Sequence, residues 1–293
     1  MRKTCLTLIC TSLLSMAATA AFADDYATDN KASGNCGDKD QYNLFNPTPD
    51  NCLRDIAPRF RTTAWNATTL DAGHIQFEAA DFIYQNSDRL FSIRHNQVLN
   101  SFAPTVSVGL LNNVDFHVTP AFSVISDTYR NSFGGMRWSK NHTTLNMDSV
   151  NLASTINLWG NDGGATAFGI MPVMQVPVTG GQWIGGVALP FSVNLPQQFT
   201  LSYVPGFYLT TQGATYGQFE HAVVLDEAFT DKVHGFINFT AIVTSRSSQD
   251  WWGYAGFGAS YQLTRNIEAY ASMRFGFEGA YDLAPYAGIA WRF

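Results

Sequence analysis

The chain has 293 residues, of which 46% are hydrophobic and only 14% are charged, and its formal net charge is −6 at pH 7. This acidic balance argues against nucleic acid as a partner, because binding to a phosphate backbone depends on basic patches. Few charges together with 14% aromatic residues are typical of strands that turn alternate side chains to lipid and to water.

Residues 1–23 have the features of a secretory signal peptide. Arg2 and Lys3 precede an apolar run over residues 6–21, and small residues precede a cleavage site after Ala23. No later stretch approaches the roughly eighteen consecutive apolar residues of a transmembrane helix. We therefore expect any membrane-spanning part of the mature chain to cross with strands, since only helices and closed barrels satisfy their backbones in lipid.

Residues 24–70 form a polar stretch that is rich in Asn, Asp, Pro and Thr and has no convincing periodicity. We expect it to form a periplasmic segment or a plug inside a barrel. Cys36 and Cys52 are the cysteines that remain after the signal peptide, so we predict a disulfide between them in the oxidising periplasm.

Two motifs in this region carry a family resemblance. Arg54-Asp55 follows a Pro-rich run, and Asp71-Ala72-Gly73-His74 opens the alternating strand that comes next. The pattern resembles the outer-membrane, transporter-like family of the MetA pathway of phenol degradation, over residues 45–293, although residues 57–61 replace a more acidic, Pro-rich run. The resemblance implies an outer-membrane barrel that takes up small, apolar or aromatic compounds.

From residue 71 onward apolar and polar residues alternate, which is the pattern of a strand with two different faces. Short turns such as Asn112-Asn113 and Pro196-Gln197 lie on the side of both termini, and we expect longer loops at 86–97, 128–147 and 177–185 on the other side. These features predict an all-β fold, a transmembrane antiparallel β-barrel at residues 71–293. Its twelve predicted strands lie near residues 72–79, 102–110, 114–119, 150–158, 165–176, 186–195, 198–210, 218–228, 233–244, 251–263, 267–277 and 283–293.

The last strand ends at the chain terminus, as in Gram-negative outer-membrane barrels. Phe293, Trp291 and Ile289 share one apolar face, which would favour aggregation in water but is suited to lipid. A soluble β-sandwich is the alternative. Prolines within the predicted strands cannot donate to a sheet, so we expect bulges or strand ends near Pro104, Pro120, Pro172, Pro190, Pro205 and Pro285.

The strand parity turns charged and tyrosine side chains into the lumen. Acids and bases are mixed, so the bore lacks the single-sign ring of a strongly ion-selective pore. Four of the charges could instead be braces between neighbouring strands, and we expect Glu78 and Arg274 to meet across Tyr286. The tyrosines either bind a solute by stacking or simply fill the bore. The pore-lining candidates are Glu78, Asp115, His117, Glu220, His234, Tyr254, Glu268, Tyr270, Arg274, Tyr286 and Arg292.

The sequence does not indicate an enzyme. Ser139 and His142 share a loop, but nothing else suggests a catalytic triad, and there is no phosphate loop or zinc-spaced Cys/His cluster, so we expect neither a cofactor nor a metal. Two functional hypotheses remain: a porin-like channel for passive uptake, and a non-conducting structural or surface-interaction barrel. In both, the expected location is the bacterial outer membrane.

The expected partners are outer-membrane lipids, a small-molecule solute, and lipopolysaccharide near Arg130, Arg137 and Lys140. The sequence leaves the oligomeric state open.

Overall fold

The computed structural model describes residues 36–293 except 37, 63, 91–92, 134–135, 180, 247–250, 279 and 281. The side chains of residues 81–100 and 127–142 are outside the description too, and with them the predicted lipopolysaccharide contacts of Arg130, Arg137 and Lys140. The predicted signal peptide, residues 1–23, also lies outside the described residues.

Strands dominate the described chain, and its helices are the short 3-10 turns η2 (Lys39–Gln41), η3 (Asp50–Cys52) and η4 (Pro196–Gln198). No helix among the described residues is long and apolar enough to span a bilayer. The strands are β1 (Ile75–Leu90), β2 (Ile93–Phe102), β3 (Thr105–Leu111), β4 (Val114–Phe133), β5 (Met136–Trp159), β6 (Thr166–Pro177), β7 (Trp183–Ala188), β8 (Phe191–Leu195), β9 (Phe199–Gln212), β10 (Ala214–Ala228), β11 (Val233–Thr244), β12 (Trp251–Thr264), β13 (Ile267–Phe277) and β14 (Leu283–Arg292).

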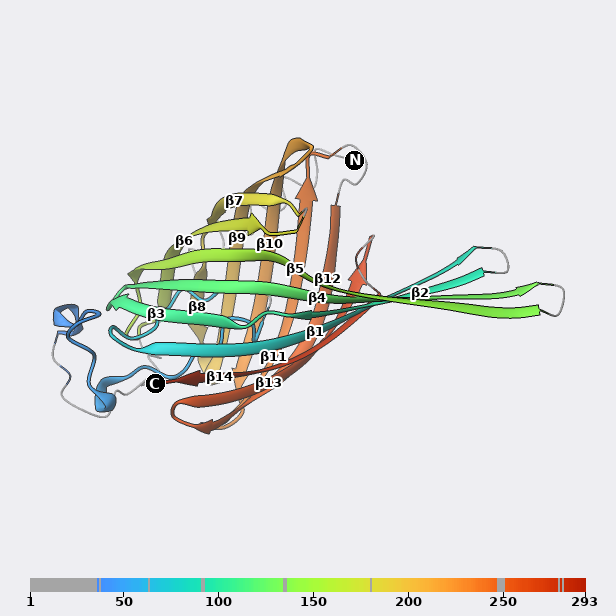
Figure 1. The fold of residues 1–293 in the computed structure, drawn as a ribbon. Helices are drawn as coiled ribbons and strands as arrows, with labels where there is room; N and C mark the ends of the chain where they lie inside the picture. The colour runs from blue at the N-terminus through green and yellow to red at the C-terminus, as the bar shows by residue number, and fades with distance from the viewer. Residues whose placement is uncertain are drawn as a thin grey trace, which may run out of the picture.

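These strands form one antiparallel sheet that closes on itself (Figure 1). Strands β2 and β3 share the position between β1 and β4, and β7 and β8 share the position between β6 and β9. Because β14 pairs with β1 and β9 pairs with β10, the result is a closed 12-strand barrel. The predicted fold class is confirmed.

Prolines explain why two strand positions are split. Pro104 separates β2 from β3, and Pro190 separates β7 from β8. Two further prolines lie on strands next to these breaks. Pro120 is beside a β-bulge in the β4–β5 pairing, and the carbonyl of Pro205 on β9 accepts a hydrogen bond from the N–H of Leu189 at 2.9 Å. Pro172 lies next to a gap in the pairing of β6 with β5, and Pro285 lies next to a gap in the pairing of β14 with β1.

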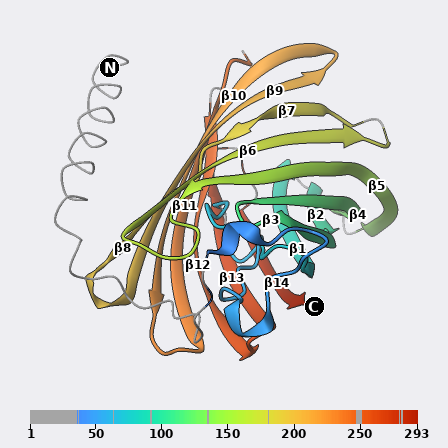
Figure 2. The ribbon, with the colours of Figure 1, turned by 90° about the vertical axis from the view of Figure 1, so that its left-hand side faces the viewer.

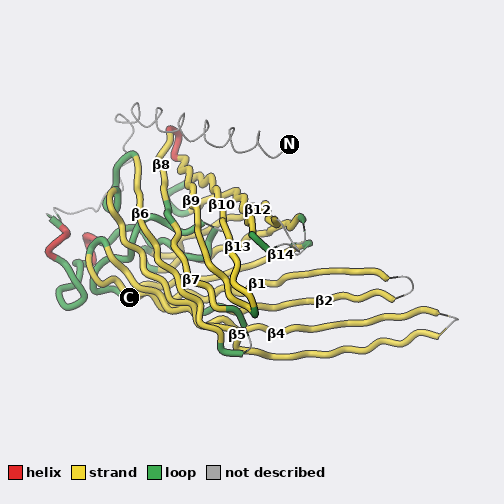
Figure 3. The backbone as a smooth tube through the Cα atoms, turned by 90° about the horizontal axis from the view of Figure 1, so that it is seen from above, coloured by secondary structure: helices red, strands yellow, loops and turns green. Residues whose placement is uncertain are grey.

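Two hairpins continue well beyond the barrel wall (Figures 1 and 3). The β1–β2 pairing reaches Leu90 and Ile93, and the β4–β5 pairing reaches Phe133 and Met136. The loops predicted at 86–97 and 128–147 are therefore wrong, because most of these residues continue the strands. Beyond the bilayer both faces of a strand meet water, so backbone pairing persists without the alternation that identifies a strand in the sequence.

The two ends of the barrel differ. Ile75 and Phe293 exchange both backbone hydrogen bonds at 2.9 Å, which places the start of β1 beside the end of β14 at the end with the short turns. We call this the turn end, and the opposite one, from which the hairpins project, the ribbon end (Figure 1).

The outer face of the barrel is apolar. On β14, Ile289 and Trp291 are 44% and 53% exposed, whereas Ala290 and Arg292 between and beside them are 0% and 2% exposed. The same alternation runs through β11 and β12, where Ile237 and Phe257 are among the most exposed apolar side chains. A closed barrel with an apolar outer face satisfies its backbone in lipid.

Candidate functional site: the bore and its inner segment

The bore is occupied by a segment that precedes β1. We call residues 52–72 the inner segment; viewed into the turn end, it lies within the ring of strands (Figure 2). Its buried apolar residues are Cys52, Leu53, Ile56, Ala64, Ala67, Leu70 and Ala72.

The middle of the inner segment is attached to the wall through Asp115 on β4. This fully buried carboxylate pairs with the guanidinium of Arg59 and accepts the backbone N–H of Leu70 at 2.7 Å. On the wall side, His117 Nε2 lies 2.7 Å from the same carboxylate, and the other ring nitrogen lies 2.8 Å from the hydroxyl of Ser107. The arrangement satisfies a charge that would otherwise be costly in the interior.

Glu78 on β1 forms the second attachment. Its two carboxylate oxygens accept the backbone N–H groups of Arg59 and Phe60, at 2.7 and 2.9 Å. The hydroxyl of Tyr270 on β13 donates to the same carboxylate. Among the described residues, Glu78 therefore contacts the inner segment and Tyr270, in place of the pair with Arg274 expected from the sequence.

Arg61 forms the third attachment, toward the opposite wall. Its guanidinium lies 3.1 Å from a carboxylate oxygen of Asp226 on β10 and 3.4 Å from one of Glu268 on β13. The hydroxyl of Tyr286 donates to the carbonyl of Arg61 at 2.6 Å. His234 lies 3.3 Å from Asp226, so this candidate also belongs to the Arg61 site.

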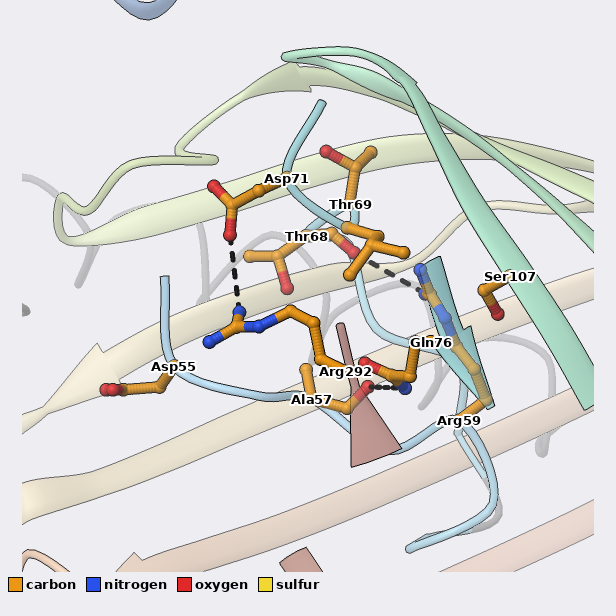
Figure 4. Close-up of a pocket in the computed structure, with 10 residues that line it drawn as sticks. Asp55, Ala57, Arg59, Thr68, Thr69, Asp71, Gln76, Ser107 and Arg292 are labelled. Atoms are coloured by element: carbon orange, nitrogen blue, oxygen red, sulfur yellow. Dashed lines mark hydrogen bonds and ion pairs between the residues drawn. The ribbon is translucent and has the colours of Figure 1, made fainter. Parts of the chain in front are cut away.

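A charged cluster closes the turn end. Arg292 on β14 donates to the carbonyl of Arg54 at 2.7 Å and lies 3.3 Å from Asp71, with which Arg54 also pairs at 3.2 Å. Figure 4 shows Arg292 reaching toward Asp71 across a small pocket between the inner segment and the wall. Lys39 extends the cluster to Asp162 in the β5–β6 turn, at 2.7 Å.

Asp162 lies outside the membrane-spanning strands. Burial alone would raise the pKa of its carboxyl group, but the neighbouring charges of Arg54 and Lys39 outweigh burial and lower that pKa below its ordinary value. Asp162 is therefore held as an anion where the start of the described chain meets the wall.

Aromatic rings line the wall where glycines make room for them. A Cβ atom on Gly288 would collide with Tyr270, and one on Gly258 would collide with Phe236, so both rings lie directly over glycine backbone. Tyr270 and Tyr286 meet edge to face with ring centroids 6.4 Å apart.

Arg274 lies over the ring of Tyr286, with its guanidinium carbon 4.1 Å from the ring centroid, a cation–π contact. Glu220 on β10 interacts electrostatically with Arg274. Tyr254 stacks edge to face with Trp252 at 5.4 Å. These residues form a second group on the ribbon side of the Arg61 site.

The structure thus divides the sequence candidates into two groups. Those that contact the inner segment, or bond the carboxylate of a residue that does, are Glu78, Asp115, His117, His234, Glu268, Tyr270, Tyr286 and Arg292. The others, Glu220, Tyr254 and Arg274, lie on the wall nearer the ribbon end.

Several functional residues were missed at the sequence level. Asp226 has the same strand parity as Glu220, so the alternation of β10 already places it in the lumen. The other site residues lie in a stretch without periodicity. No sequence signal marked Lys39, Arg59 or Arg61, whereas Arg54 and Asp71 belong to the two motifs of the family resemblance.

Comparison with solved structures supports this architecture. The fold is similar to the crystal structure of the COG4313 outer membrane channel from Pseudomonas putida F1, with a TM-score of 0.51 and 7% sequence identity over 82% of this chain and 100% of that chain. The protein is an outer-membrane β-barrel. At this identity the likeness shows the fold alone. No protein-family model and no curated protein matches the sequence.

Two further structures share less of the geometry. The translocator domain of the autotransporter NalP from Neisseria meningitidis has a TM-score of 0.43 and 13% identity over 75% of this chain and 88% of that chain. The NanC porin has a TM-score of 0.43 and 11% identity over 74% of this chain and 98% of that chain.

Proposed function

We propose that the protein is an outer-membrane channel for passive uptake of small, apolar or aromatic solutes, and that the inner segment is a plug that restricts the bore. The observation that carries the proposal is how the bore is filled. Ala64 of the inner segment packs against wall residues of mixed size: Ala153, Ala188 and Ala222, with the larger Met171, Val204, Val224 and Phe236. The segment thus fills the bore at this level, and we infer that a passage opens when it moves.

The attachments of the inner segment suit a plug that can be displaced. Its three main sites, at Asp115, Glu78 and Asp226 with Glu268, are ion pairs and hydrogen bonds. When the segment moves as a whole, water and ions can solvate both partners of each contact, whereas the apolar packing of Ala64 and Trp65 against the wall opposes the movement. The plug is therefore specific in position without being fixed permanently.

The solute class follows from the rings and from the family resemblance. Tyr254, Tyr270 and Tyr286 place aromatic rings on the bore wall. The hydroxyl of Tyr286 bonds the carbonyl of Arg61 in this structure, so movement of the segment would release it for the substituents of an aromatic solute. Residues 71–74 and 54–55, which carry the resemblance to the phenol-degradation family, support the same class.

A second candidate function is a non-conducting surface-interaction barrel. The observation that favours it is the sheet of β1, β2, β4 and β5 that extends past the ribbon end (Figure 3). A projecting sheet offers a large contact surface for another molecule.

A planar-bilayer recording distinguishes the two functions. Purified protein should show small, steady conductance steps, and the variant Arg59→Ala should show larger ones because the segment is held less tightly. Lys232→Ala, an exposed cation in a turn, is the matched control and should leave the conductance unchanged. A wild-type protein and an Arg59→Ala variant that are both silent would reject the channel in favour of the surface-interaction barrel.

A further inference from the structure

Two polar side chains in the bore have their hydrogen-bonding groups buried and unused. Asn238 is 5% exposed and Thr240 is 2% exposed, and both point inward from β11. Neither polar atom of the Asn238 carboxamide, nor the hydroxyl of Thr240, has a hydrogen-bond partner in the described part of the chain. Buried polar groups are nearly always paired, and leaving one unpaired costs about 1–3 kcal/mol.

The strand register shows what surrounds this pair. Asn238 lies opposite Gly256 on β12, which lies opposite Arg274 on β13. A Cβ atom on Gly256 would approach Asn238 Oδ1 at 2.9 Å and Arg274 Cγ at 3.1 Å, so both side chains border the space left by this glycine. Thr240 lies opposite Tyr254, two residues nearer the ribbon end.

The pair has one basic and one acidic side chain near it. Arg274 lies over the ring of Tyr286, and Glu220 on β10 is close enough to interact with Arg274. Such a region does not select a net-charged solute by long-range attraction. The carboxamide of Asn238 offers a donor and an acceptor together, the complement of a hydroxyl group that also donates and accepts.

The pair also borders the inner segment. Val224 and Ala222, the register neighbours of Asn238 and Thr240 on β10, pack in the apolar cluster around Ala64. The packed segment therefore lies against a wall position whose polar groups it does not satisfy. A solute that supplies those hydrogen bonds is favoured over the segment at this level of the bore.

We propose that Asn238 and Thr240 form a binding site for an uncharged ring compound that carries adjacent hydroxyl groups, such as a cyclic polyol. The hydroxyls pair with the carboxamide and with Thr240, while Tyr254 and Tyr286 contact the ring. The proposal goes beyond the proposed function, because it assigns to the same bore a polar ring solute in addition to the apolar or aromatic class, and binding of that solute does not depend on conduction.

Binding can be measured without any flux. Trp252 contacts Tyr254 edge to face and lies opposite Ile242, two residues beyond Thr240, so a solute at the site should change its fluorescence. The folded, full-length protein in detergent is titrated with myo-inositol, and Trp252→Phe identifies the part of the change that belongs to this residue. The wild type should show a saturable change.

Two variants of similar volume remove the hydrogen-bonding groups. Asn238→Leu and Thr240→Val should each weaken myo-inositol binding, by about tenfold if one bond to a buried group is lost. Thr215→Val, which removes an exposed hydroxyl at the end of β10, is the control and should bind as the wild type does.

Three results would overturn the proposal. The first is no saturable fluorescence change in the wild type. The second is myo-inositol binding by Asn238→Leu and Thr240→Val that equals binding by the wild type. The third is binding of cyclohexanecarboxylate that is tighter than that of myo-inositol and depends on Arg274, which would make this an anion site. Failure of the channel proposal can be told apart from failure of the binding site. A barrel that never conducts in a bilayer still binds myo-inositol in detergent if the site exists.

Discussion

Arg59 and Asp115 form an ion pair in the middle of the bore, with side chains that are only 3% and 0% exposed. One partner belongs to the inner segment and the other to the barrel wall. Their pairing therefore couples the position of the segment to the wall more directly than a surface contact would, since solvent screens a buried pair much less.

Removing Arg59 should release the segment. Arg59→Ala leaves the buried Asp115 carboxylate without its cation, with the Leu70 N–H and His117 among its remaining partners. Breaking a buried ion pair in this way costs about 3–5 kcal/mol. Protease cleavage of the inner segment and single-channel conductance should both rise, while the barrel still shows β-rich circular dichroism and heat-dependent gel mobility.

The double variant Arg59→Ala/Asp115→Asn tests the cause. A neutral amide no longer needs a cation, and its oxygen can still accept the N–H of Leu70, so the double variant should recover part of the lost protection. If the double variant is as sensitive to protease as the single one, the charge of Asp115 is not what holds the segment.

The disulfide between Cys36 and Cys52 limits the freedom of the chain that leads into the bore. It joins residues separated by 16 positions in the sequence, and closing a loop of this length stabilises by about 3 kcal/mol on the loop-entropy estimate. Reduction should therefore increase protease cleavage between residues 38 and 51 without changing the strand content.

Cys36→Ser/Cys52→Ser should behave like the reduced wild type, with or without reductant. The pairing itself is checked by counting thiols after denaturation of protein isolated from the envelope. Two free thiols in that protein would mean that the bond does not form there.

Strands could be predicted from the sequence only where they lie in the membrane. Alternation located all twelve strand positions, because lipid on one side and the bore on the other impose a period of two on residues such as Ile289, Ala290 and Trp291. It failed for the hairpin extensions, whose backbones pair although their sequence does not alternate.

It also failed for the inner segment, whose conformation is set by individual contacts and not by a repeating pattern. Alternation indicated which wall charges face the bore but not their partners, because Arg59 and Arg61 are distant from Asp115 and Glu268 in sequence. The expected brace between Glu78 and Arg274 assumed an empty bore, and the backbone of Arg59 and Phe60 occupies that place.

Arg274 should influence what passes the wall on the ribbon side of the segment. Arg274→Ala removes the cation over Tyr286 and the charge that faces Glu220, so the flux of anionic test solutes relative to cationic ones should fall at least a few-fold. The measurement is ion selectivity in a bilayer under a salt gradient.

Arg246→Ala is the matched control for this change, because Arg246 makes a comparable contact with Tyr216, at 5.7 Å, but is exposed at the end of β11. Equal selectivity in the wild type and both variants would show that Arg274 braces the wall and that the solute path does not pass it.

Acid should loosen the turn end. The pKa of Asp162 is below its ordinary value of 3.8 in the folded protein, since Arg54 and Lys39 outweigh the effect of burial. A depressed folded-state pKa stabilises the folded arrangement above the unfolded-state pKa, and the stabilisation is lost as pH falls through the folded value. Protection of residues 38–54 from protease should therefore be constant from pH 7 to about pH 5 and decline below about pH 4.

Asp162→Asn isolates this contribution from the other carboxylates. The variant should be less protected than the wild type at pH 7, because Arg54 and Lys39 lose their anion, and the difference between the two proteins should shrink as the pH falls below about 4. Asp231→Asn changes an exposed acid in another short turn at the same end and should follow the wild type. Digestion at low pH needs an acid-stable protease, so pepsin is used there and hydrogen exchange covers the whole pH range. A constant difference between wild type and Asp162→Asn at every pH would show that the cluster is held by packing, with no part played by the charge of Asp162.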